Sequence, residues 1–346
     1  MDFGGQTIDA WFQRQPSEEF PTGFDYQANY AALAANLVPL HKEVTPTANV
    51  IDGGYLTDHG PEHISKLLSR ISELLKATPN PITAYECYLL LTAAQVHDVG
   101  NIFGRKKHEE KCREVMDDNL ATLPLDAVER RKIFEIAQAH GGEEKEKLSS
   151  LAKIEHIRGK PVRMQALAAI LKFADELAED SERAARYSAK KGLLPPTSSI
   201  FHAYALALID IHLDPGSGII AMRFDLKKSD ALRAFPKKDK QGEVIDTFLI
   251  DEILSRTLKT HCERVYCSRF MRPIVDVVGV SVHIDVTDDT GYTVLRNIAY
   301  RLEERGYPDA DGKDIYSLCP ELREWDGNGR FDGSHLARKL GMQHVI

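Results

Sequence analysis

Residues 93–101 read AAQVHDVGN, and this stretch decides the fold. It predicts an apolar helix that ends in an adjacent histidine and aspartate, His97 and Asp98, with Gly100 to stop it. Burying an imidazole and a carboxylate at a helix end costs several kcal/mol unless another group pairs with them or coordinates them. A divalent metal ion would do so. Because His-Asp pairs are also common at helix caps, the interpretation depends on whether other segments bring ligands to the same place.

A second segment, the helix expected to begin at Pro61, carries apolar residues at the helical i, i+3, i+4, i+7 spacing, and His63 lies on this stripe. His59 stands four residues earlier, which is the spacing of two ligands on one helix face. Because Gly60 and Pro61 lie between them, the helix is expected to begin only after His59. His63 is therefore the expected ligand. His59 is a second candidate ligand, or a residue that supports the ligands or faces the substrate.

Two further helices each place one polar side chain among aliphatic ones. The helix expected to begin near Asp126 carries His140 on its apolar face and is followed by glycines. The helix that we expect Pro161 to open carries Asp175 on its apolar side. One such residue is ordinary, but several in one helical bundle indicate a shared ion.

The order His63, then His97 and Asp98, then Asp175 in ILKFADELAED resembles the H…HD…D signature of the HD-domain superfamily of metal-dependent phosphohydrolases. The sequence segments TDHGPEH and HDVGNIFGRKKHEEK are most similar to those of the HD-CE subgroup, which is found in bacterial conflict and defence systems. The resemblance covers residues 58–187. It implies a helical bundle that holds one or two divalent ions, a nucleotide or another phosphoester as substrate, and a role in antiviral defence.

Two histidines outside this signature, His108 and the already mentioned His140, decide whether the site is expected to hold one ion or two. In order along the chain they match the additional histidines of relatives with two ions, and Asp98 would then bridge the pair. Two ions suit hydrolysis, since one can lower the pKa of a water while both hold the phosphoryl oxygens. The alternative is that His108 and His140 are core or capping residues. Histidine and aspartate ligands do not select one metal, so the ion could be Mn, Fe, Mg, Ni or Zn. The expected metal ligands are His63, His97, Asp98, His108, His140 and Asp175.

A glycine-bounded loop after the HD pair carries Arg105, Lys106 and Lys107. Beside a metal, such cations can hold a phosphate and neutralise charge in the transition state; otherwise they are a solvated turn. Asn101 stands where many relatives have lysine, so these loop cations would have to replace it. The expected catalytic residues are His97, Asp98, His59, Arg105 and Lys107.

Other basic residues flank the helix of Asp175. Those before it form either a solvated surface or a contact for substrate phosphates; they are His156, Arg158, Lys160 and Arg163. After it, Arg183 or Arg186 is a candidate to stack on or pair with a ligand.

Composition bounds these interpretations. At 346 residues the chain is long enough for one large or two moderate domains, and 43% hydrophobic and 28% charged residues are typical of globular proteins. The net charge of -8 disfavours broad nucleic-acid binding, although a basic pocket stays possible. We see no signal-peptide or membrane-spanning stretch, and five scattered cysteines suit reduced thiols, so we expect a cytoplasmic protein without membrane contact. A homo-oligomer is possible.

Three parts are expected along the chain. Residues 1–55 would form an N-terminal helical wrap with a helix ending near Pro39, and residues 56–192 an HD-type metal-binding helical domain. Residues 193–346 would form an α+β accessory domain that closes the pocket, mediates oligomerisation or recognises a base. The predicted fold class is mainly α: an HD-type helical bundle with a smaller C-terminal α+β domain that contains a short antiparallel sheet.

Within the accessory domain the hydrophobic pattern predicts five elements. Residues 200–213 and 218–226 read as strands joined by a hairpin connection. A helix is expected over residues 247–270, a strand over 275–286 and a helix over 290–305.

The resulting expectation is a phosphohydrolase that cleaves a phosphoester or phosphoanhydride of a nucleotide, such as a dNTP. An HD-type nuclease or a cyclic (oligo)nucleotide phosphodiesterase would share every ligand. A non-catalytic nucleotide sensor is the alternative from another class. The chain has no Walker-type loop, no Rossmann fingerprint and no GxSxG motif, which leaves dinucleotide redox chemistry and serine hydrolysis without support.

Overall fold

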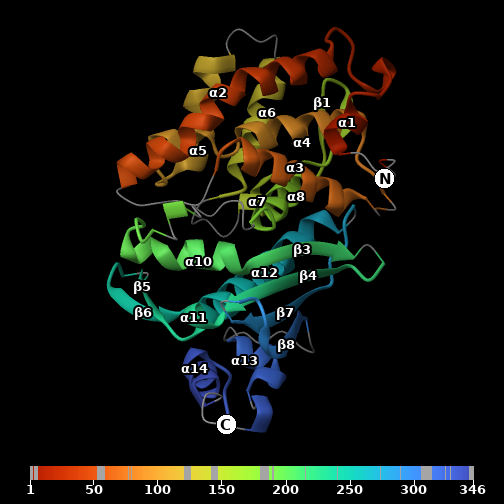
Figure 1. Ribbon diagram of the computed structural model, residues 1–346. Coiled ribbons are helices and arrows are strands. Elements are labelled where there is room, and N and C mark those ends of the chain that lie inside the picture. Colours follow the sequence, from red (N-terminus) through yellow and green to blue (C-terminus); the bar gives the residue numbers. More distant parts are fainter. Residues whose placement is uncertain are drawn as a thin grey trace. The chain divides into compact units, whose positions relative to one another are not determined.

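The chain folds into two compact units in a computed structural model (Figure 1). One unit comprises Met1–Ala178 with Tyr266–Asp276, and the other comprises Glu179–Val265 with Val277–Ile346. The structure describes residues 3, 7–52, 59–76, 78, 80–120, 126–141, 147–179, 187–188, 191–214, 216–239, 241–272, 274–288, 290–304, 314–323, 325–327 and 329–342.

The first unit is helical, apart from one small hairpin. Its elements are α1 (Ile8–Phe12), η1 (Ser17–Glu19), α2 (Tyr26–Asp52), α3 (Pro61–Leu75), α4 (Ala84–Val96), η2 (Val99–Phe103), α5 (His108–Leu120), α6 (Ala127–Gln138), α7 (Lys147–Ser150), β1 (Glu155–Ile157), β2 (Lys160–Val162) and α8 (Met164–Glu176).

Helix α4 is the centre of this unit, and every one of its residues is buried. It contacts α2, α3, α6 and α8 (Figure 1). Its start is fixed by a capping box, in which Thr83 accepts from the Glu86 backbone N–H and Glu86 accepts from that of Thr83. Since α4 ends at Val96, the next two residues, His97 and Asp98, are delivered into the interior of the bundle.

Two expected helix boundaries in this unit are wrong. Helix α2 continues through Pro39 and Pro46 instead of ending near Pro39. Each proline removes one backbone hydrogen bond, but α2 buries Leu33, Leu37, Val44 and Ala48, and this packing outweighs the loss. Pro161 does not open a helix, because it lies in β2, paired with β1; α8 begins at Met164. Proline is tolerated there because this two-stranded sheet has only edge strands.

The second unit combines helices with a sheet. Its elements are η4 (Pro196–Ser198), α10 (Ser199–Ala207), β3 (Leu208–Asp214), β4 (Ile219–Lys227), α11 (Lys228–Ala231), β5 (Ala234–Lys238), β6 (Val244–Phe248), most of α12 (Leu249–Met271), β7 (Gly279–Thr287), β8 (Thr293–Glu303), α13 (Ile315–Leu318), η5 (Pro320–Leu322), η6 (Trp325–Gly327) and α14 (Gly333–Met342).

The four-stranded sheet has the order β3-β4-β7-β8, and β5 pairs with β6 in a separate hairpin. The pair β3–β4 is antiparallel, as expected, and β7–β8 is also antiparallel, whereas β4 and β7 are parallel. A parallel pair needs a long crossover, and the segment that contains α12 supplies it. The predicted mainly α fold with a smaller region of antiparallel strands is therefore confirmed.

Two assignments in the second unit are corrected. Residues 290–305 were expected to be helical, but β8 runs through them and pairs with β7. Ile298, Tyr300 and Leu302 are buried while Ala299 and Arg301 are exposed, which is the period of two of a strand. Residues 200–213 are helix α10 followed by β3, because short apolar runs do not distinguish buried helix from strand.

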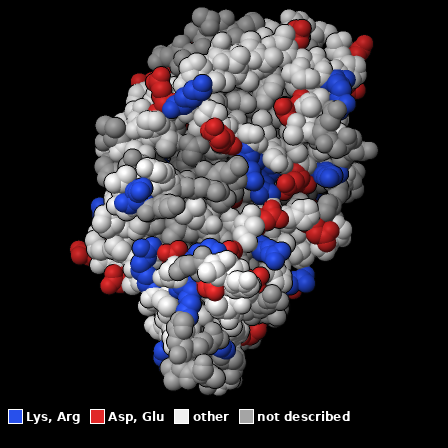
Figure 2. Space-filling model, in the orientation of Figure 1, with Lys and Arg blue, Asp and Glu red and all other residues white. Residues whose placement is uncertain are grey.

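The apolarity of the helices and the surface charge can also be described. Among the described residues, no helix has the length and apolarity needed to cross a membrane. On the face drawn in Figure 2, the described basic and acidic side chains are interspersed.

Candidate metal centre

The HD pair sits at the end of α4 with its histidine fully buried. The His97 Nδ1 lies 2.9 Å from the carbonyl oxygen of Ala94. Because a carbonyl only accepts, Nδ1 carries the hydrogen, and in the neutral ring, the form that binds metals, Nε2 has a lone pair. Nε2 is a buried atom that makes no hydrogen bond within the described part of the chain. A buried lone pair of this kind is suited to a metal ion.

A first cluster joins His97 and Asp98 to His63 from α3 and Asp175 from α8. One ligand atom from each of the four lies within 4.8 Å of the others. The His63 Nε2 is 3.2 Å from Asp175 Oδ1 and 3.7 Å from Asp98 Oδ2. The His97 Nε2 is 3.6 Å and 3.5 Å from the same two oxygens.

A second cluster consists of Asp98, His108 and His140. His108 is the first residue of α5, and His140 lies just after α6. Their Nε2 atoms are 3.1 Å and 3.5 Å from Asp98 Oδ1 and 3.2 Å from each other.

Asp98 belongs to both clusters, and its two oxygens divide between them. Oδ2 faces His63 and His97, whereas Oδ1 faces His108 and His140. The fully buried Asn101 donates from Nδ2 to Asp98 Oδ1 at 2.9 Å, which fixes the carboxylate plane. A carboxylate held in this way can bridge two ions.

Three of the histidines present Nε2 to the clusters for the same reason. His97, His108 and His140 each lie within hydrogen-bond distance of the carbonyl oxygen three residues earlier, so each Nδ1 carries the hydrogen. Such contacts fix both the tautomer and the ring orientation of metal-binding histidines.

The residues present fit divalent metal ions. Imidazole nitrogens and carboxylate oxygens are the ligands of Zn and other first-row metals, at metal–ligand distances of about 2.1 Å. Tetrahedral or octahedral geometry at that distance separates neighbouring ligand atoms by about 3.0–3.4 Å. The separations of 3.1–3.7 Å within the two clusters are close to this range.

The electrostatics of the ion-free centre are dominated by the two aspartates. Burial opposes ionisation of Asp98 and Asp175, but the surrounding histidines outweigh it and hold the pKa of each carboxyl well below its ordinary value. Burial would lower the pKa of His97, but Asp98 and Asp175 raise it to about 9. Burial lowers the pKa of His140. In the ion-free protein, a protonated His97 therefore places positive charge beside these two carboxylates.

His59 lies beside the clusters and is part of neither. Its Nδ1 is 2.8 Å from Asp98 Oδ2, and its Nε2 is 3.1 Å from the Arg105 guanidinium. Because arginine only donates, Nε2 accepts and Nδ1–H donates to Asp98. The His59 backbone N–H donates to Thr45 in α2. As expected, α3 begins only after His59, at Pro61.

The other basic residues that the sequence suggested, where the structure describes them, make contacts away from the two clusters or are exposed. The Lys107 side chain is 65% exposed and pairs with Glu110 at 3.5 Å. Arg163 donates to Glu86 at 2.6 Å, Arg158 donates to the Thr22 carbonyl, and Lys160 donates to the Glu18 carbonyl, so these three side chains make contacts within the bundle. His156 is exposed in β1. Arg183 and Arg186 lie outside the described residues.

Two supporting residues were missed by the sequence interpretation. Asn101 was considered only as a substitute for a phosphate-binding lysine, although its three-residue spacing from Asp98 is typical of a local side-chain contact. At Gly100, a Cβ would lie 2.0 Å from the His108 carbonyl oxygen, so the glycine allows α5 to approach η2. A glycine inside an apolar motif was the available signal.

The fold and the clusters together define an HD-type, metal-dependent hydrolase-like domain. A family model described as HD-CE matches residues 53–248, more than half of the chain, and the chain belongs to this family. Comparisons with curated proteins and with solved structures found no match.

Proposed function

We propose that this protein is a phosphohydrolase that uses two divalent ions to cleave a phosphoester or phosphoanhydride of a nucleotide, such as a dNTP. The observation that carries the proposal is the division of the Asp98 oxygens between two His/Asp clusters. The first ion is assigned to His63, His97, Asp98 and Asp175, and the second to Asp98, His108 and His140. Mn, Fe, Mg, Ni and Zn all suit these ligands.

Bound ions would lower the pKa of a water molecule and neutralise phosphoryl oxygens. The protein's own contribution is to hold that arrangement rigid. Asn101 and His59 fix the shared carboxylate from opposite oxygens, at 2.9 Å and 2.8 Å. Preorganised groups of this kind need no rearrangement during the reaction.

Arg105 is the cation that we assign to substrate phosphate. Its guanidinium contacts His59, which itself bonds the shared carboxylate, so a phosphate at the ions would lie near it. Guanidinium groups bind phosphate oxygens through paired N–H donors. Lys107 is retained as a weaker candidate, since its exposed side chain pairs with Glu110.

The test is phosphate release from a substrate panel with added Mn²⁺, using dNTPs, cyclic nucleotides and oligonucleotides. We expect release from a nucleotide by the wild-type protein and its loss in Asp98→Asn. Cleavage confined to oligonucleotides or cyclic nucleotides would favour a nuclease or a phosphodiesterase instead. Nucleotide binding without turnover, unchanged by Asp98→Asn, would favour a sensor in a defence system and would overturn the proposal.

A further inference from the structure

Glu109 is a buried carboxylate between a histidine of the second cluster and a lysine. Only 4% of the residue is exposed. Its Oε2 is 3.4 Å from His108 Nδ1, and its Oε1 is 3.2 Å from Lys147 Nζ. The Lys147 ammonium is the ion-pair partner of this buried carboxylate and compensates its charge.

The Glu109 side chain lies against Gly141. A Cβ added at Gly141 would lie 3.3 Å from the Glu109 Cβ and 3.6 Å from its carboxyl carbon. Gly141 directly follows His140, so Glu109 contacts the neighbour of one histidine of the second cluster and the ring of the other. The carboxylate therefore lies close to both histidines of the second cluster.

We propose that Glu109 is a positioning residue for the second ion and that Lys147 holds it in place. A carboxylate close to the Nδ1–H of a histidine attracts this hydrogen and makes Nε2 a stronger metal ligand. The Arg105 carbonyl, 3.1 Å from His108 Nδ1, fixes the same tautomer but carries no full charge. The inference rests on the assignment of His108 and His140 to a second ion.

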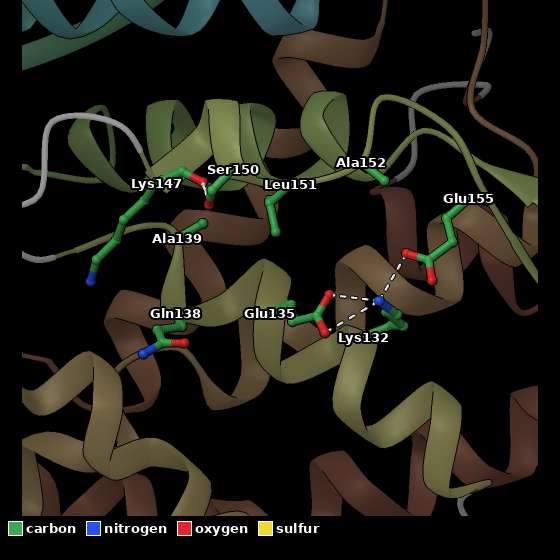
Figure 3. A pocket seen from close by; sticks show the side chains of 9 residues that line it. All are labelled: Lys132, Glu135, Gln138, Ala139, Lys147, Ser150, Leu151, Ala152 and Glu155. Atoms are coloured by element: carbon green, nitrogen blue, oxygen red, sulfur yellow. Dashed lines mark hydrogen bonds and ion pairs between the residues drawn. The ribbon is translucent and has the colours of Figure 1, made fainter.

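Lys147 is reachable from outside. It lines a cavity of about 490 Å³ between α6, α7 and β1 (Figure 3), and 14% of its side chain is exposed. Away from it in the same cavity, Lys132 pairs with Glu135 at 2.9 Å and with Glu155 at 2.8 Å (Figure 3). The cavity thus offers two lysines in ion pairs, of which Lys147 leads to the metal centre.

The first experiment compares Glu109→Gln with the wild-type protein by Mn²⁺ titration, with electron paramagnetic resonance to report the spin coupling of a two-ion centre. We expect the second ion to bind about 10- to 100-fold more weakly and the coupled signal to decline, while the first ion is retained. Glu109→Asp should restore part of the affinity. Glu135→Gln, a matched change of an acid in the cavity, should leave both ions unaffected.

The second experiment tests Lys147. If Lys147 contributed only its positive charge, removing it would strengthen the binding of a nearby cation. If Lys147 positions Glu109, removing it should weaken the binding of the second ion. We expect Lys147→Ala to weaken the second ion and the double variant with Glu109→Gln to be no weaker than Glu109→Gln alone. Ethylammonium, which is small enough for the cavity, should restore the second ion in Lys147→Ala. Lys132→Ala serves as the control and should bind both ions normally.

The outcomes separate this inference from the proposed function. If the wild-type protein binds two ions and Glu109→Gln also binds both with unchanged affinity, Glu109 does not position His108 and the inference is wrong. Tighter binding of the second ion in Lys147→Ala would overturn the role of Lys147. If the wild-type protein binds no ion, the proposed function itself is wrong.

Discussion

At the scale of single residues, the centre depends on how one carboxylate is shared. Asp98 belongs to both clusters, whereas Asp175 belongs to the first and His140 to the second. Substitutions at these positions should therefore have different consequences.

Asp175→Asn should lower the number of bound ions from two to one, and His140→Ala should do the same at the other position. Each substitution removes a ligand from one cluster and leaves the other intact. Equilibrium dialysis followed by elemental analysis measures the ratio. Loss of both ions in either variant would show that the clusters do not act as separate positions.

Gly100→Ala should displace His108. The added Cβ would lie 2.0 Å from the His108 carbonyl oxygen and 2.8 Å from the Cys112 nitrogen, so the first turn of α5 must move. We expect loss of the second ion and a decrease of about 1–3 kcal/mol in the free energy of unfolding. Urea denaturation and metal analysis measure the two effects.

Gly341→Ala is the control for this substitution, because a Cβ there meets no atom within 4 Å. It should bind both ions and lose no stability. Normal metal binding by Gly100→Ala would contradict the role of Gly100.

Several site residues could be singled out from the sequence because each is polar on an apolar helix face. His63, His140 and Asp175 are examples, and the structure brings all three to Asp98 or to its partners. The positions of Asn101 and Glu109 could not be predicted in this way, because their contacts depend on how η2 and α5 pack. The roles of His63, His140 and Asp175 as metal ligands, and of Asn101 and Glu109 as positioning residues, are predictions.

At the scale of elements, an ion pair between the buried Glu86 and the partly buried Arg163 lies at the start of α4. Glu86 is 1% exposed and accepts from the backbone of Thr83 and from the Arg163 side chain, at distances between 2.6 and 2.9 Å. This contact joins the start of α4 to the start of α8, and these two helices deliver His97 and Asp175.

Arg163→Met should lower the free energy of unfolding by about 3 kcal/mol, because it leaves the Glu86 charge buried without its guanidinium partner. Urea denaturation at neutral pH measures this change. Arg131→Met is the control, since its side chain is 65% exposed in a pair of 3.7 Å, and it should change stability by less than about 1 kcal/mol. Equal effects of the two substitutions would contradict the importance of the buried pair.

Local signals predicted several elements. Gly60 and Pro61 mark the start of α3, Asp126 caps α6, and the pattern over residues 247–270 predicts α12. Long-range packing decided the rest. Helix α2 passes through two prolines because its apolar residues are buried, and β8 is a strand because β7 pairs with it.

At the scale of the whole molecule, we expect folding, protonation and metal binding to be linked. The pKa of His97 is raised from 6.5 to about 9 in the ion-free protein, where burial is outweighed by Asp98 and Asp175. A raised histidine pKa contributes stability that is fully present below about pH 6.5 and is lost as the pH rises through about 9. A metal ion bound to His97 would have to displace this proton.

Metal affinity should therefore rise by up to about tenfold per pH unit from about pH 6.5 to about pH 9, for one displaced proton. We expect saturating Mn²⁺ to raise the unfolding temperature more near pH 8.5 than near pH 6.5. Thermal unfolding with and without the ion measures this difference. A gain that is equal at both pH values would show that His97 does not exchange a proton for a metal ion.

Our central proposal is that histidines and aspartates far apart in the sequence hold metal ions through one shared carboxylate. Elemental analysis of the purified wild-type protein and of Asp98→Asn, after identical dialysis against Mn²⁺, tests it most directly. We predict two ions per chain in the wild-type protein and a loss of both in the variant. Equal metal content in the two proteins, or none in the wild-type protein, would contradict the claim.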